Sequence, residues 1–333
     1  MRIQVRGAMQ SHPLTRGLLA IAMLLCTAIS TAQDYPARSV RIIVGYVAGG
    51  GPDVVARTVA KRLSEILGQP FVVENRPGAG ATTATAQVAK MPADGYSLIL
   101  GETGQLAIAP FIYKNLPYDT VKDFTPISLL VTSSGLLLLA NAKSSIKTIQ
   151  DLVREARARP GKIDYGSSGV GTIHHIAMEA FKADMGLAIE HIPYKGSGQS
   201  VASILAGDVL LVMTSGTAAS AHIRSGSLNV LAVSSAARLP AYADAPAIAE
   251  LIKDFEFLSE MGLLAPAGLP PERLARLSRA LTQAMDSAEL RETFRKIDYN
   301  LRFSTPQEYS ENLRRNLQRY ERAVRAAKIT TDE

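Results

Sequence analysis

The sequence has almost no cysteine: Cys26 is the only one, and it lies in an N-terminal apolar run, 17–29. Three arginines precede this run, no acidic residue occurs before Asp34, and small residues up to Ala32 follow it. This order is typical of a secretory signal peptide, which we place at residues 1–32 with cleavage near Ala32. The mature chain would then contain no cysteine, which excludes a disulfide, a thiol nucleophile and a thiolate metal site.

The apolar run is also too short to form a membrane-spanning helix. A segment of this kind directs export and is then removed, so we expect a periplasmic protein. Leu25 stands directly before Cys26, where a lipoprotein signal favours a small residue. The sequence therefore disfavours lipidation of Cys26 but does not exclude it.

The charges are balanced and show no basic cluster. The chain has 36 basic and 30 acidic residues, and the arginines of the signal peptide leave a mature excess of three positive charges. A nucleic-acid-binding protein would concentrate its basic residues in a patch interleaved with aromatics. The sequence therefore excludes nucleic acid as the expected partner.

The usual catalytic motifs are missing as well. The sequence contains no G-x-S-x-G elbow, no phosphate-binding P-loop and no H-E-x-x-H. We therefore predict a protein that is not an enzyme and binds no cofactor. A mechanism that uses two carboxylates stays open, because acidic residues occur throughout the chain.

What the chain does have is a repeated order of apolar strand, glycine turn and amphipathic helix. With about 300 residues in the mature chain and 47% apolar residues, two domains are expected. The alternation predicts α/β architecture with parallel, doubly wound sheets, joined twice so that they form a hinged cleft. We expect a first domain over 33–134 plus 259–333, on which the helical tail packs, and a second over 135–258.

Four glycine-rich loops follow expected strands. Small hydroxyls and unshielded N–H groups at the start of a helix favour an anion, because the helix dipole and the unpaired donors act together. In doubly wound sheets, ligands bind at this edge. The four loops predict a site that holds carboxylates, and they are VAGGGPD (47–53), PGAGATT (77–83), ETGQ (102–105) and GSSGVGTIHH (166–175).

Seven segments spread in order along the chain carry a resemblance to a known family. The sequence resembles the Bug family, the periplasmic receptors of tripartite tricarboxylate transporters, from about Tyr35 to Ile329. The segments are YPARSVRIIVGYVAGGGPDVVAR, LGQPFVVENRPGAG, ADGYSLILG, LPYDTVKDFTPI, GKIDYGSSGVGT, HIPYKGS and GLLAPAGLP. The resemblance implies a type II periplasmic binding protein fold, a small carboxylate ligand and delivery to separate membrane permease subunits.

The same resemblance implies two sets of ligand-binding residues that act through backbone amides, small hydroxyls and bridging waters. The set from the first domain is Tyr46, Ala48, Ala79, Thr103 and Gly104. The set from the second domain is Ser167, Ser168, Gly169, Thr172 and His175.

Two departures from the family pattern affect the expected ligand. Gly45-Tyr46 stands where the family commonly has Pro-Phe, and Thr214-Ser215 stands where it often has Asp-Asn. With no carboxylate at this second position, a ligand ammonium lacks a partner. We therefore expect Ser215 to face a mono-, di-, tri- or aromatic carboxylate without an amino group.

Other residues have two interpretations that the sequence leaves open. Gly49 and its neighbours serve binding or a tight turn, and Lys195 neutralises an anion or is a solvated loop lysine. His174 and His175 are adjacent and point about 100° apart on a helix, so they are not expected to share a metal ion. We expect His174 in the core and His175 as a hydrogen-bond donor in the cleft.

The sequence thus predicts an extracytoplasmic solute-binding protein that acts as a monomer and delivers a carboxylate to a transporter. A periplasmic ligand sensor for a signalling partner has the same fold and cleft, and the sequence alone does not separate the two.

Overall fold

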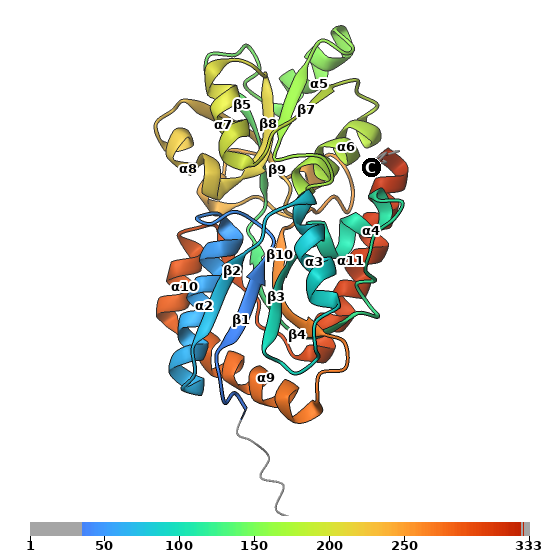
Figure 1. Cartoon of the computed structure of the whole chain (residues 1–333). Coiled ribbons are helices and arrows are strands. Elements are labelled where there is room, and N and C mark those ends of the chain that lie inside the picture. The colour runs from blue at the N-terminus through green and yellow to red at the C-terminus, as the bar shows by residue number, and fades with distance from the viewer. Residues whose placement is uncertain (1–34, 328, 330–333) are drawn as a thin grey trace, which may run out of the picture. The chain divides into compact units, whose positions relative to one another are not determined.

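The computed structural model describes residues 35–327 and 329. Arg38 begins a compact unit that contains two β-sheets (Figure 1). No helix in this described part of the chain is both long and apolar enough to cross a bilayer. The predicted signal peptide lies outside the described residues.

The first sheet has six strands in the order β11-β4-β10-β3-β1-β2. β1 runs parallel to β2 and β3, whereas β10 runs antiparallel to β3 and β4, and β11 runs antiparallel to β4. The strands are β1 (Val40–Val44), β2 (Phe71–Asn75), β3 (Ser97–Glu102), β4 (Phe124–Ser133), β10 (Glu260–Pro266) and β11 (Tyr299–Leu301).

The second sheet has five strands in the order β7-β6-β8-β5-β9. β6 runs parallel to β7 and β8, and β5 runs antiparallel to β8 and β9. The strands are β5 (Leu136–Asn141), β6 (Asp164–Ser167), β7 (Glu190–Pro193), β8 (Leu211–Ser215) and β9 (Leu228–Val233).

The sequence predicted parallel sheets, and the structure adds antiparallel strands to both of them. The chain leaves the first sheet at the end of β4 and returns to it at the start of β10. The returning strand enters next to the carboxyl end of β3, with Met261 opposite Glu102, and must therefore run antiparallel to it. The return of the chain to the first sheet thus explains why β10 runs antiparallel to its neighbours.

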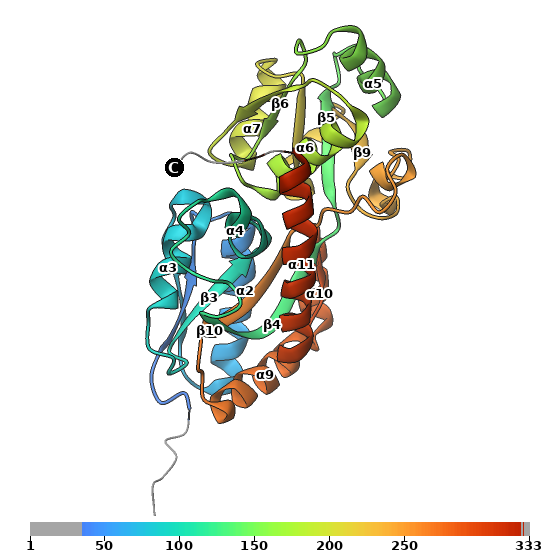
Figure 2. The same cartoon turned by 90° about the vertical axis from the view of Figure 1, so that its right-hand side faces the viewer.

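Helices cover both faces of the first sheet (Figure 2). Right-handed crossovers place α2 and α3 on opposite faces; α9 packs on α2, whereas α11 shares a buried cluster with α3. The helices of this part are α2 (Gly51–Leu67), η1 (Ala79–Ala81), α3 (Thr82–Ala89), the π-turn η2 (Gly104–Ile108), α4 (Ala109–Ile112), α9 (Pro271–Met285), α10 (Ala288–Arg295) and α11 (Pro306–Ala327).

The helices between the strands of the second sheet agree with the predicted alternation, and the structure adds α8 and the short helices η3 and η4. The structure contains α8 directly after β8, which the sequence analysis did not predict because its small residues, GTAASAHIR, give a weak apolar pattern. The helices are α5 (Ile149–Ala158), α6 (Ile173–Met185), α7 (Ser197–Ala206), α8 (Gly216–Arg224), η3 (Pro240–Tyr242) and η4 (Ile248–Glu250).

The C-terminal helix α11 packs on both parts of the molecule. It contacts β4 and η2 of the first part and also α6 of the second (Figure 2). Tyr320 and Val324 are buried in the same apolar cluster as Ile173 and Phe181 of α6. The expectation that the tail packs on the first domain was therefore incomplete. The last turns of α11 also pack in the apolar core on one face of the second sheet.

Candidate functional site

The loop after β1 combines an exposed tip with an anchored base. Val47 is 65% exposed, and Ala48 and Gly49 are also exposed. Gly49 has a φ of 84°, which favours glycine, and its N–H donates to Asp53 Oδ2 over 2.9 Å. Asp53 also accepts from Arg57 Nε over 3.0 Å, so it anchors the start of α2. Gly49 therefore allows the tight turn before α2. Ala48 lies at the exposed tip of the same loop.

The neighbouring loop with Ala79 reaches close to the end of β1. Ala79 is exposed and has a φ of 44°, and the buried Ala81 has a φ of 75°. Both angles lie in the left-handed region that non-glycine residues rarely adopt. A Cβ atom on Gly45 would collide with Ala81, whose Cα would lie only 2.8 Å away. The absence of a side chain at Gly45 therefore allows the two loops to meet.

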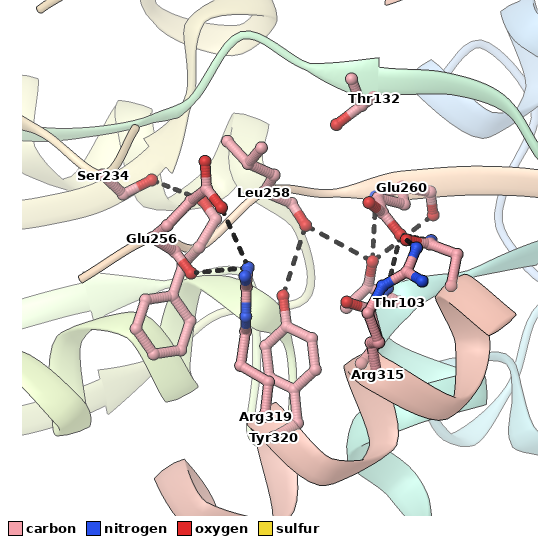
Figure 3. A network of polar contacts seen from close by, with 12 residues as sticks. Thr103, Thr132, Ser234, Glu256, Leu258, Glu260, Arg315, Arg319 and Tyr320 are labelled. Atoms are coloured by element: carbon pink, nitrogen blue, oxygen red, sulfur yellow. Dashed lines mark hydrogen bonds and ion pairs between the residues drawn. The ribbon is translucent and has the colours of Figure 1, made fainter. Parts of the chain in front are cut away.

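Thr103 turns its side chain away from the loop ends. Its Oγ1 accepts the Glu260 N–H over 2.9 Å and lies 3.5 Å from the carbonyl oxygens of Leu258 and Glu260. Tyr320 of α11 donates to the same Leu258 carbonyl, and Ser234 donates to Phe257 (Figure 3). The Thr103 hydroxyl thus ties β3 to the chain segment that returns from the second sheet, and it is buried.

Tyr46 and Gly104 are brought together at the ends of β1 and β3. A Cβ atom on Gly104 would lie 3.7 Å from the Tyr46 hydroxyl oxygen. Tyr46 is hydrogen-bonded to Glu102, the last residue of β3, which also accepts from Ser259 Oγ over 2.7 Å. Burial raises the pKa of the Glu102 carboxyl, although both hydrogen bonds oppose the shift. Glu102 lies in one of the four glycine-rich loops but was not among the predicted ligand-binding residues.

The hydroxyls of the loop 166–175 are used inside the loop itself. Ser167 Oγ accepts the Gly169 N–H over 3.1 Å and lies 2.7 Å from His191 Nε2. Ser168 Oγ lies 2.6 Å from His174 Nδ1. Thr172 is the N-cap of α6, because its Oγ1 accepts the His175 N–H over 3.4 Å. These bonds hold the loop in one conformation and orient its hydroxyl oxygens.

Of the two adjacent histidines, His175 is more deeply buried than expected for a residue in the cleft, and His174 is half-buried. His175 is buried, its Nδ1 accepts the Gly171 N–H over 3.1 Å, and its ring stacks on His191 at 4.1 Å between centroids. His191 stacks in turn on Tyr165 at 4.8 Å. His174 bonds to Ser168 and keeps its Nε2 buried and unpartnered. The stack of rings is thus buried, and both adjacent histidines are hydrogen-bonded to the loop 166–175.

Burial lowers the pKa of these imidazoles. The pKa of His174 falls to about 4 by desolvation alone. Desolvation also lowers the pKa of His175 to about 4, with help from the Lys182 charge. The pKa of His191 falls to about 3 through desolvation and the neighbouring His175. All three rings are therefore neutral at pH 7.

Lys195 and Ser215 lie apart from these contacts. Lys195 is exposed, and within the described residues no carboxylate lies at ion-pair distance from it. Ser215 is the N-cap residue of α8 but makes no capping hydrogen bond with its side chain. Between described residues, no hydrogen bond joins the first predicted set to the second. Gly171 of the loop 166–175 lies against α4, because a Cβ atom there would collide with the side chain of Ile112.

Comparison with known proteins identifies the family of this chain. A family model described as the tripartite tricarboxylate transporter family receptor matches residues 55–329. The Bordetella pertussis protein BugT is 34% identical over 318 residues, which cover 94% of this chain and 97% of BugT. The chain belongs to this receptor family. The resemblance to the Bug proteins is thereby confirmed.

Two solved structures support the same conclusion. The R. palustris protein Rpa4515, solved with adipate, has a TM-score of 0.82 and 32% identity, covering 90% of this chain and all of that one. MatC from Rhodopseudomonas palustris, solved with bound malate, has a TM-score of 0.79 and 26% identity, covering 87% and 100%. The predicted two-domain periplasmic binding protein fold is confirmed.

The structure shows the surroundings of the two positions, Gly45 and Thr214-Ser215, at which the sequence departs from the family pattern. At Gly45, any side chain, including the proline common in the family, would collide with Ala81. Thr214 is fully buried and its Oγ1 has no hydrogen-bond partner, while the following Ser215 is half-buried. Neither residue supplies a carboxylate, but Asp298 lies close by, because a Cβ atom on Gly216 would collide with its carboxyl group.

Proposed function

We propose that this receptor captures a small carboxylate in the periplasm and delivers it to the membrane permease subunits of a tripartite transporter. The observation that carries the proposal is the similarity over their whole length to two proteins solved with dicarboxylates, adipate and malate. The loops after β1, β3 and β6 support it, because they offer backbone donors and hydroxyl oxygens but no basic side chain.

In this proposal the two domains predicted from the sequence close on the ligand. The loop ends around Tyr46, Ala48, Ala79 and Gly104 would hold it from one side and the loop 166–175 from the other. The hydrogen bonds within the second loop support preorganisation, since Ser168 and Thr172 are already oriented. Binding to such a site costs little ordering of side chains.

We further propose that the ligand lacks an amino group. A buried ammonium without a carboxylate partner carries a desolvation cost of several kcal/mol. Thr214 and Ser215 supply no negative charge near the second sheet, whereas a plain carboxylate avoids this cost. Glu102 is an acid near the first loops, but Ser259 and Tyr46 already donate to it.

A thermal-shift screen of the mature protein against carboxylates tests the function. A ligand at 100 times its dissociation constant should add about 2.7 kcal/mol of stability. Calorimetry on matched pairs, succinate with aspartate and adipate with 2-aminoadipate, should show at least tenfold tighter binding of the plain acid, about 1.4 kcal/mol. Tighter binding of the amino acids would contradict the proposed ligand class, and no response to any carboxylate would contradict the function.

Substitutions in the loop 166–175 test how the anion is held. Ser168→Ala should weaken carboxylate binding by about 1–3 kcal/mol, the scale of a hydrogen bond to a charged group. Thr172→Ala should weaken it by loosening the loop, because the Thr172 hydroxyl donates to the Gly169 carbonyl and caps α6. Lys195→Ala should have a smaller effect, because that side chain is exposed. Calorimetry measures each affinity. Thr172→Ser keeps the N-cap oxygen and serves as the control, and a dominant effect of Lys195 would contradict binding by dipoles.

A further inference from the structure

A chain of hydroxyls surrounds one carboxyl group beneath the loop after β1. Ser259 is buried and gives its only proton to Glu102 Oε1 over 2.7 Å. Tyr299 lies close to Ser259 and to Glu102. Tyr46 bonds to Glu102 from the other side. Three residues from distant parts of the sequence thus lie around one carboxyl group.

No positive charge balances this group among the described residues. Glu102 takes part in no ion pair there, and the titratable neighbours are all phenols or acids. Burial and the charge of Glu102 raise the pKa values of Tyr46 and Tyr299. Tyr118 lies near Tyr46, and Asp298 lies near Tyr299. An ionised Glu102 is therefore a negative charge held in place by hydroxyl donors alone.

The same group lies beside the loop ends proposed to hold the ligand. Tyr46 joins Glu102 directly, and its oxygen lies near Gly104, two residues after Glu102. A carboxylate held by these loops would place a second negative charge close to the first. Like charges that share a partly buried site favour protonation of one of them.

On the basis of the proposed function, we propose that carboxylate binding is linked to uptake of a proton at Glu102. Ionised Glu102 then acts as a specificity-determining residue that disfavours dianions. Protonation removes this repulsion. Ser259 and Tyr46 still bond to the acid, because a protonated carboxyl keeps its carbonyl oxygen as an acceptor. The raised pKa of the Glu102 carboxyl, caused by burial, agrees with this assignment.

Calorimetry on the full mature protein between about pH 6 and pH 8 tests the proposal, with adipate as the probe. Titrations in phosphate and in Tris, which differ in ionisation enthalpy, count the protons bound with the ligand. We expect uptake of between zero and one proton and an affinity that falls with rising pH, by at most about tenfold per pH unit. The histidines near the loop titrate at about pH 3–4, below this range.

Variants assign the proton to its site. Glu102→Gln keeps the size and the acceptor oxygen, and we expect it to abolish both the uptake and the pH dependence. Glu260→Gln is the matched control: Glu260 is also a buried acid of raised pKa, but Asn312 and Asn316 hold it. This control should retain the proton uptake. With 2-aminoadipate, whose ammonium favours an ionised Glu102, the uptake should shrink or reverse.

The wild-type measurement alone is sufficient to reject the proposal, even if Glu102→Gln does not fold. Binding of adipate without proton uptake would overturn it while leaving the proposed function intact. Uptake that persists in Glu102→Gln would also overturn it. If adipate does not bind, the acid that stabilises the protein most in the thermal-shift screen takes its place. If no carboxylate binds, the proposed function fails, and the proton linkage fails with it.

Discussion

Acidification from pH 6.5 to pH 5 is expected to destabilise the protein through the histidines His174, His175 and His191. Their pKa values are lowered by burial to about 4, 4 and 3. The unfolded chain, in which histidine has a pKa of about 6.5, binds more protons than the folded one in this range. The stability is therefore complete above about pH 6.5 and is lost as the pH falls towards the folded pKa values.

The expected loss is about 2 kcal/mol for each imidazole over this range, an order-of-magnitude figure. Urea unfolding at several pH values measures it. His191→Phe keeps an aromatic ring between Tyr165 and His175 but does not titrate, so it should reduce the slope of stability against pH. His222→Phe, on the half-exposed surface of α8, should leave the slope unchanged. A slope that is unaltered in His191→Phe would contradict this origin of the acid sensitivity.

Replacement of Gly45 by alanine is expected to reduce both stability and ligand binding. The added Cβ atom would collide with Ala81, whose Cα would lie 2.8 Å away, so backbone has to move. Overpacking of this kind typically costs about 1–3 kcal/mol. The displaced segments carry Tyr46 and Ala79, so the affinity for a carboxylate should fall as well.

Denaturant unfolding and calorimetry measure the two effects of Gly45→Ala. Gly198→Ala is the control, because it makes the same change where no atom lies within 4 Å of the new Cβ. Gly198 lies in α7, so alanine there should be neutral or slightly stabilising. If Gly45→Ala has wild-type stability, the loop that contains η1 can move to accept the new Cβ atom without loss of stability, and the prediction is contradicted.

Local patterns were sufficient to predict most elements of this chain. The apolar spacing before Gly68 predicts a helix over 54–67, and the structure ends α2 at Leu67 with Gly68 at a φ of 69°. The segment before Pro160-Gly161 likewise predicts a helix over 149–158, and α5 has these bounds. Both elements depend on residues within one or two turns of each other. β11, by contrast, has three residues and exists only through its pairing with β4.

The side-chain contacts of the candidate site were much harder to predict. The sequence indicated the loops, but not that Thr103 would bond to Glu260 or that His175 would stack on His191. These partners lie far apart in the chain, and no periodicity within a segment encodes them. Whether the predicted residues bind a ligand stays a prediction.

The sequence by itself determined the receptor family, the α/β elements and the glycine-rich loops, because short-range spacing and ordered motifs specify them. The tertiary structure alone decided the strand directions around β10, the packing of α11 on both sheets and the hydroxyls that meet at Glu102. These features depend on where the chain crosses between the sheets at Ser133 and Ser259. The crossings bring distant residues into contact, and burial of Glu102 and of the histidines follows from that contact.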